Sequence, residues 1–129
     1  MNLEEQTMPS TEVSEMSIVS ILMNAPQAFD ECDKLKPEHF FSGWLRAVFV
    51  EMKHQHSKGQ FDVITLSEAL KDVVSLEDLH NVCQYHGYSS RAIEIHVKKL
   101  IDASKARQLY KMGGMLQTLA FETTPIQER

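Results

Sequence analysis

Cysteine, glycine and proline are all scarce in this 129-residue chain. Its two cysteines, Cys32 and Cys83, stand far apart and form no C-x-x-C pair, so a disulfide framework is not indicated. Five glycines and four prolines leave no stretch with the composition of a long flexible linker. The scarcity of these residues predicts a folded domain with two reduced thiols, in a cytoplasmic protein.

Long apolar runs and an excess of positive charge are also absent. No stretch approaches the ~18 apolar residues of a membrane span, and the first apolar run follows glutamates rather than the basic start of a secretory signal. With 13 basic and 18 acidic residues, the formal charge is −5. Because broad binding to a phosphate backbone requires clustered Lys and Arg, we expect no membrane association and little direct nucleic-acid binding beyond a local basic patch.

What the chain does contain is apolar residues at helical spacing. Hydrophobic residues make up 43% and charged residues 24% of the sequence, ordinary values for a globular protein with a single core. The helical patterns cover residues 10–24, 26–33, 44–58, 66–70, 76–87 and 90–122. We predict an all-α fold, a compact bundle of about five or six short helices followed by one long helix. The expected core residues are Leu22, Phe40, Val48, Phe49, Leu66, Leu79 and Ile93.

The stretch "KGQFDVITLSEAL", residues 58–70, joins two of these helices. Thr65 and Glu68 have the spacing of a capping box, in which the two side chains satisfy helix N–H groups reciprocally. The only strand-like run, Phe61 to Ile64, precedes them, and both of its end residues are expected to be buried. We expect the Asp62 carboxylate to face backbone N–H groups at the start of the next helix. Asp62, Thr65 and Glu68 are therefore interpreted as a structural junction.

Gly113 and Gly114 interrupt the long C-terminal pattern. Each glycine inside a helix costs roughly 1 kcal/mol relative to alanine. Either the helix bends at this pair or another backbone approaches it closely, and we favour the bend.

Metal and catalytic motifs receive little support. Glu51 with His54 and Glu77 with His80 form two E-x-x-H pairs, the spacing found in di-iron bundles, but such bundles need two further glutamate-bearing helices. Cys83 could pair with His80 or His86, yet its apolar neighbours predict a buried, unreactive thiol. No phosphate-binding loop of the type G-x-x-x-x-G-K-[ST] occurs. We therefore predict no catalytic residue, no metal and no cofactor in this chain.

The run "EHFF…LRAVFVEM…KGQFDVITLSEAL" resembles the N-terminal domain of DnaB-type replicative DNA helicases. There "EDFY" precedes a helix bearing "H-x-x-I-F" and a junction "G-x-x-[IV]-D-x-x-T-[LV]". The matching residues are Glu38, Phe40, Phe41, Val48, Phe49, Gly59, Phe61, Asp62, Thr65 and Leu66. The segment before them resembles the family's opening helix through Pro9, Glu15, Ser17, Ile18 and Leu22.

Residues 89–109, "SSRAIEIHVKKLIDASKARQL", extend the resemblance with Ile93, Glu94, Arg107 and Leu109 in register, so that it covers residues 9–122. The sequence departs from the family pattern at Leu45, where a histidine is usual, and at Ser20, where a glycine is usual. The resemblance implies a disordered tail over 1–9, a globular head over 10–88 and a long helix over 89–122. That helix would be the first arm of a hairpin, with residues 123–129 as a linker or the start of the second arm.

The resemblance also implies a non-catalytic interaction module. In these helicases the domain forms the collar of a hexameric ring, pairs through its hairpin and binds the C-terminal domain of a DnaG-type primase, while ATP and Mg²⁺ act in a separate C-terminal domain. A helicase loader is a further possible partner. Methionine-rich helical surfaces adapt to partner grooves. The candidate partner-binding residues are Leu109, Met112, Met115 and Leu116.

Two alternatives remain open at this point. The chain is either a part of such a helicase or a stand-alone relative of its collar, which would regulate or load a helicase by mimicry. An unrelated metal-binding helical enzyme is the second alternative, and it rests on the E-x-x-H pairs. The apolar residues of the last helix could also simply pack on the short helices.

Overall fold

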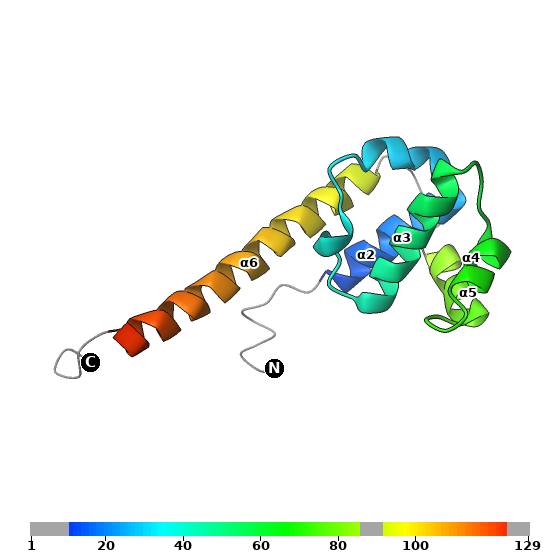
Figure 1. The fold of residues 1–129 in the computed structure, drawn as a ribbon. Coiled ribbons are helices and arrows are strands. Elements are labelled where there is room, and N and C mark those ends of the chain that lie inside the picture. The colour runs from blue at the N-terminus through cyan, green and yellow to red at the C-terminus, as the bar shows by residue number, and fades with distance from the viewer. Residues whose placement is uncertain (1–10, 86–91, 124–129) are drawn as a thin grey trace.

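The computed structural model describes residues 11–85 and 92–123, with side chains on the last helix as far as Gly114. Every regular element in these ranges is helical, which confirms the all-α prediction. The elements are α2 (Glu12–Asn24), the 3₁₀ helices η1 (Pro26–Glu31) and η2 (Pro37–His39), α3 (Gly43–Ser57), α4 (Val63–Ala69), α5 (Leu76–Tyr85) and α6 (Ile93–Thr123). The short elements form a compact head, and α6 extends away from it (Figure 1). The expected tail over 1–9 and the segment 124–129 lie outside the described residues.

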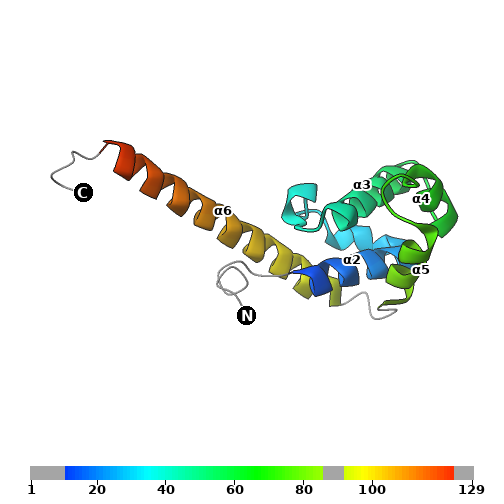
Figure 2. The ribbon, with the colours of Figure 1, turned by 90° about the horizontal axis from the view of Figure 1, so that it is seen from below.

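Helix α2 is the central element of the head. It packs against α5, α6, η1 and α3, and it lies beside the first turns of α6 in both views (Figures 1 and 2). Three buried serines on α2 leave room for close neighbours. One of them, Ser20, donates its hydroxyl to the carbonyl of Cys83 at 3.1 Å, and Asn24 donates to the same carbonyl at 2.7 Å. These bonds join the end of α2 to the end of α5.

The core lies between α2, α3, α4, α5 and the first turns of α6, and it includes residues of η1 and the loop that follows it. All seven residues expected in the core, from Leu22 to Ile93, are fully buried. Phe40 stacks on Phe49 with ring centroids 4.8 Å apart, and Phe29 lies 6.2 Å from Phe49. Burying large apolar and aromatic side chains is the main favourable term in folding. The aromatic cluster therefore joins the residues before α3 to its middle turns.

The start of α4 differs from the expected one. The helix begins at Val63, with Asp62 as its N-cap, so the capping box pairs Asp62 with Thr65 rather than Thr65 with Glu68. The strand-like run Phe61 to Ile64 forms no strand, because two of its four residues, Val63 and Ile64, belong to the helix. Ile64 consequently points outward and is 55% exposed, whereas Phe61 is half-buried against the core. The carboxylate of Asp62 does face the helix start, as expected.

Helix α6 runs through Gly113 and Gly114 without interruption, and neither view shows a kink along this helix (Figures 1 and 2). The expected bend is therefore wrong. A Cβ added at either glycine would meet no atom within 4 Å, so no other backbone in the described chain approaches them. The first half of the helix buries Ile93, Val97 and Leu100 in the head. From Gln108 to Gly114 every residue is exposed.

Candidate interaction site on the final helix

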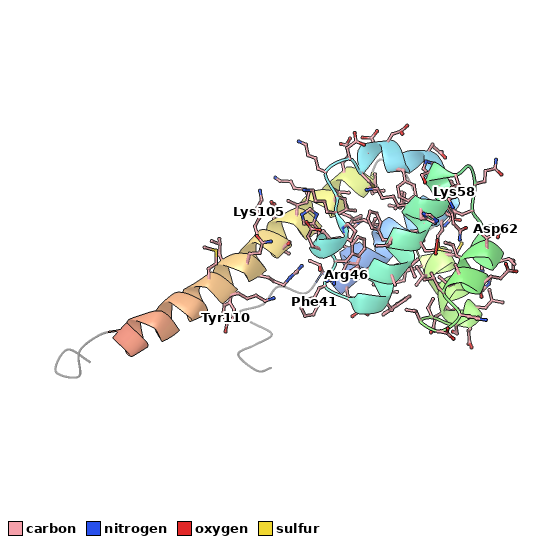
Figure 3. All side chains as sticks on the ribbon, viewed as in Figure 1. Phe41, Arg46, Lys58, Asp62, Lys105 and Tyr110 are labelled. Carbon is pink, nitrogen blue, oxygen red and sulfur yellow. The ribbon has the colours of Figure 1, made fainter. Side chains whose placement is uncertain are left out.

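The exposed stretch of α6 from Gln108 to Gly114 carries large apolar side chains. Leu109 is 67% exposed, Met112 55% and Tyr110 52%, and Tyr110 stands clear of the head (Figure 3). Leu109 and Met112 are three residues apart and therefore neighbours on one helix face. These two do not pack on the short helices, so for them the packing alternative is wrong. Met115 and Leu116 follow on the same helix, beyond the last described side chain.

Arg107 fixes the base of this exposed stretch to the head. Its Nη2 donates to the backbone carbonyl of His39 at 3.1 Å, and its guanidinium lies over the Phe41 ring, 5.2 Å from the centroid. Arg107 is only 7% exposed. A guanidinium can hydrogen-bond at its edge while it stacks through its face on an aromatic ring. The hydrogen bond goes to the last residue of η2 and the ring contact to the loop between η2 and α3, so Arg107 positions the end of η2 and this loop against α6.

The same loop is held from its other side by Glu15 and Arg46. The fully buried Glu15 carboxylate accepts hydrogen bonds from the Ser42 backbone N–H at 2.9 Å and from the Thr11 hydroxyl at 2.5 Å. Arg46 Nη2 donates to the Phe40 carbonyl at 2.6 Å. Charged donors and acceptors make stronger hydrogen bonds than neutral ones. The loop is therefore fixed to α2, α3 and α6 at the point where α6 leaves the head.

The junction before α4 has a structural role and lies at the far side of the head from this base (Figure 3). Asp62 accepts from the Thr65 N–H at 2.8 Å, and the Thr65 hydroxyl donates to Gln55 Oε1 on α3 at 2.7 Å. Gln55 returns a bond to the Thr65 carbonyl at 3.2 Å. Sequence patterns gave no signal for Gln55, because its contact with Thr65 depends on how α3 and α4 pack. Glu68 is exposed and takes no part in the cap.

The candidate metal and nucleophile residues are not brought together. His54, Glu77 and His80 are exposed, and Glu51 is half-buried. Among residues 11–85 and the described part of α6, no group of three or more His, Cys, Asp or Glu side chains could hold a metal ion. His86, the other candidate partner of Cys83, lies outside the described residues.

The two thiols differ from the expected arrangement. Cys83 is only half-buried, with its Sγ 3.9 Å from Asn24 Oδ1, so the buried position predicted for it is wrong. The buried thiol is that of Cys32, whose pKa is raised to about 12 by burial, aided by the nearby acids Asp33 and Glu31. A thiol with so high a pKa is almost entirely protonated near pH 7 and is a poor nucleophile. As for membranes, no helix in the described segments is both long and apolar enough to cross one.

Comparison with known proteins identifies the family. The model of the DnaB-like helicase N-terminal domain matches residues 7–102, well over half of the chain. No curated protein matches the sequence. The matched range includes the head, the Asp62 junction and the first turns of α6, and it ends before Arg107 and the exposed residues Leu109 to Met112. The fold, the junction and this match agree, and the chain belongs to the family of DnaB-like helicase N-terminal domains.

Proposed function

We propose that this chain is a non-catalytic interaction domain of a replicative DNA helicase, which pairs with a second copy through α6 and binds the C-terminal domain of a DnaG-type primase. The observation that carries the proposal is the exposed stretch of α6 from Gln108 to Gly114, in which Leu109 and Met112 are more than half exposed. Membership in the family of DnaB-like helicase N-terminal domains supports pairing with a second copy of the chain. ATP and Mg²⁺ would act in a separate C-terminal domain.

The exposed face of α6 has the properties of an association surface. Exposed apolar patches on folded proteins commonly mark sites of association, and burying Leu109 or Met112 would remove apolar area from water at about 25 cal/mol per Å². Gly113, one turn after Leu109, has nothing within 4 Å of its Cβ position. A second helix backbone can therefore approach closely at that point. These features fit a pair of arms packed against each other.

Primase binding is the second part of the proposal. The resemblance to DnaB-type helicases implies that the primase domain binds at the edge of paired arms, and Leu109, Met112, Met115 and Leu116 are the residues proposed to contribute. The thioether of Met112 adapts its shape to a partner more readily than a branched side chain does.

The test uses the single variants Leu109→Asp and Met115→Asp in the 129-residue chain. A carboxylate on a packed apolar face carries a large desolvation cost, so both variants should self-associate more weakly by light scattering and bind the cognate primase domain more weakly by calorimetric titration. Circular dichroism should show a folded head in both. Ile95→Asp is the matched control, because Ile95 is an exposed apolar residue on α6 about four turns earlier.

Two outcomes would overturn parts of the proposal. A wild-type protein that stays monomeric at high concentration would refute self-association. Primase affinity that is unchanged in both variants, or that falls equally in Ile95→Asp, would refute binding through this face.

A further inference from the structure

A cavity of about 400 Å³ lies at the base of α6, between that helix and the loop that precedes α3. Its lining includes three cations, Arg46, Arg107 and Lys111, and one acidic residue, Glu38. Phe41 forms part of the wall, and it lies with Arg46 on the side of the head from which α6 departs (Figure 3). In a chain with a formal charge of −5, this is a local concentration of positive charge.

One nitrogen of Arg107 lacks an acceptor. Nη2 is used by the His39 carbonyl, but Nη1 is buried and has no hydrogen-bond partner among the described residues. Buried polar groups in native proteins are nearly always paired, and an unpaired charged donor is especially unfavourable. Because Arg107 also lines the cavity, an anionic ligand bound there would lie next to a guanidinium that has an unused donor.

The helix face that lines the cavity is different from the proposed association face. Arg107 and Lys111 are four residues apart, so both lie on one side of α6, together with Ser104 and Gln108. Leu109 and Met112 do not line the cavity. A ligand can therefore occupy the cavity whether or not the exposed apolar face of α6 is covered.

We propose that this cavity binds the carboxylate of an acidic side chain presented by a partner protein. A guanidinium matches the planar geometry of a carboxylate and binds it more strongly than it binds a neutral acceptor. Arg46 and Lys111 add positive charge, and the Phe41 ring is 59% exposed, which offers an apolar surface to a residue next to the acid. The ligand is thus an acidic peptide segment with an apolar or aromatic neighbour.

The charges favour a carboxylate over nucleic acid. Nucleic-acid binding draws its affinity from many phosphate contacts along an extended basic surface, whereas the cations here surround one cavity on an acidic protein. Glu38 is part of the same lining and would repel a dianion more strongly than a single carboxylate. A single acidic side chain is small enough for one cavity and carries only one negative charge next to Glu38.

The test is an NMR titration of the ¹⁵N-labelled 129-residue protein with a blocked dipeptide of glutamate and phenylalanine. We expect saturable shifts at the backbone amides of Phe41 and Arg107. The matched dipeptide, with glutamine in place of glutamate, should bind with an affinity lower by about tenfold or more, because a charge-assisted hydrogen bond is lost. Inorganic phosphate and a short single-stranded oligonucleotide are titrated in parallel at constant ionic strength.

Three variants distinguish binding in the cavity from a general effect of the protein's charge. Arg107→Gln should abolish the shifts, and Lys111→Gln, at an exposed position that leaves the fold intact, should weaken binding severalfold. Lys105→Gln removes the same charge from an exposed site on α6 outside the cavity and should leave binding unchanged. The proposal is overturned if the glutamine dipeptide binds equally well, if Lys111→Gln and Lys105→Gln have the same effect, or if phosphate or the oligonucleotide binds more tightly at the same amides.

Discussion

The carboxylate of Asp62 accepts a hydrogen bond from the Thr65 N–H at 2.8 Å, and the Thr65 hydroxyl accepts one from the Asp62 N–H at 3.0 Å. The reciprocal pair satisfies an N–H group of α4 that has no partner inside the helix. Because the same Thr65 hydroxyl donates to Gln55 on α3, the cap also fixes the position of α4 relative to α3. The cap therefore has a tertiary as well as a local role.

Removing this cap should destabilise the domain. Asp62→Ala is expected to lower the free energy of unfolding by about 1 kcal/mol, the usual cost of losing an N-cap side chain. Urea unfolding followed by circular dichroism measures the change. Glu68→Ala is the control, since Glu68 is exposed and outside the cap, and it should have almost no effect. A larger effect from Glu68→Ala than from Asp62→Ala would contradict the assignment of the cap.

Two apolar residues of α4 should respond very differently to truncation. Leu66 is fully buried and Ile64 is 55% exposed. Leu66→Ala should cost roughly 2–5 kcal/mol through lost burial and the cavity left behind, whereas Ile64→Ala should change stability by about 0.5 kcal/mol or less. Thermal or urea unfolding of the two variants checks the orientation of α4. Equal losses would mean that the helix is rotated from the position described.

His39 should make the stability of the domain depend on pH. Its Nδ1 accepts from the Lys36 N–H at 2.9 Å, which requires an unprotonated nitrogen. Burial lowers the pKa of His39 below 6.5, and the positive charges of Lys36, Arg107 and Lys105 lower it further, although Glu38 opposes the change. The unfolded chain therefore takes up the proton more readily than the folded chain.

This contribution to the free energy of unfolding is complete above about pH 6.5 and is lost as the pH falls through the lower pKa of the folded state. We expect His39→Gln to reduce the loss of stability between neutral pH and mildly acidic pH, as measured by urea unfolding at each pH. The control is His80→Gln, at an exposed position. If the pH dependence is the same in wild type and His39→Gln, the Lys36–His39 bond has no such role.

Gly113 allows a prediction with opposite effects on two measurements. Gly113→Ala should favour the helix by up to about 1 kcal/mol, because the added Cβ meets nothing in the chain, and ellipticity at 222 nm should rise. If a second arm packs closely at this glycine, the same change should weaken self-association in light scattering. A fall in helicity would contradict the uninterrupted course of α6, and unchanged association would place the partner helix elsewhere.

The E-x-x-H pairs lead to a prediction about metal removal. His54, Glu77 and His80 are exposed on the head and, in the part of the chain with described side chains, do not join a group of three ligands. We expect less than one equivalent of iron or zinc by elemental analysis of the purified protein and an unchanged Tm after treatment with a chelator. A Tm that falls with chelator and returns with added zinc would indicate a metal site.

Periodicity predicted the core because burial follows local spacing. Val48, Phe49 and Met52 repeat at the interval of one helix face, and this face is buried whatever the details of its neighbours. The first residue of α4 was harder to predict from the sequence, because Asp62 and Thr65 are both good N-cap residues and lie three positions apart. Leu66 and Leu70 fit a helix that begins at either one. The contact with Gln55, which selects the earlier start, is long-range and leaves no local pattern.

The cavity at the base of α6 could not be predicted from the sequence either, because it also depends on long-range contacts. Arg107 falls among polar residues of a long helix, and arginines are seldom buried. Its burial depends on the η2–α3 loop, which Glu15 and Arg46 hold in place from two other helices. Three segments distant in the sequence, α2, residues 38–46 and α6, must come together before the site exists. The resemblance placed Arg107 in register with the family but carried no information about its surroundings.

The straight course of α6 has a mechanical consequence. A helix of 31 residues is about 46 Å long, and the part beyond Arg107 accounts for roughly 24 Å of that length. Because the segment is anchored at its base and every residue from Gln108 to Gly114 is exposed, a tilt at the base would be magnified along its length. A tilt of about 10° at the Arg107 anchor displaces the far end by roughly 4 Å, more than the length of a hydrogen bond. A rearrangement of the η2–α3 loop that tilted α6 would therefore produce a larger displacement at the other end of the helix.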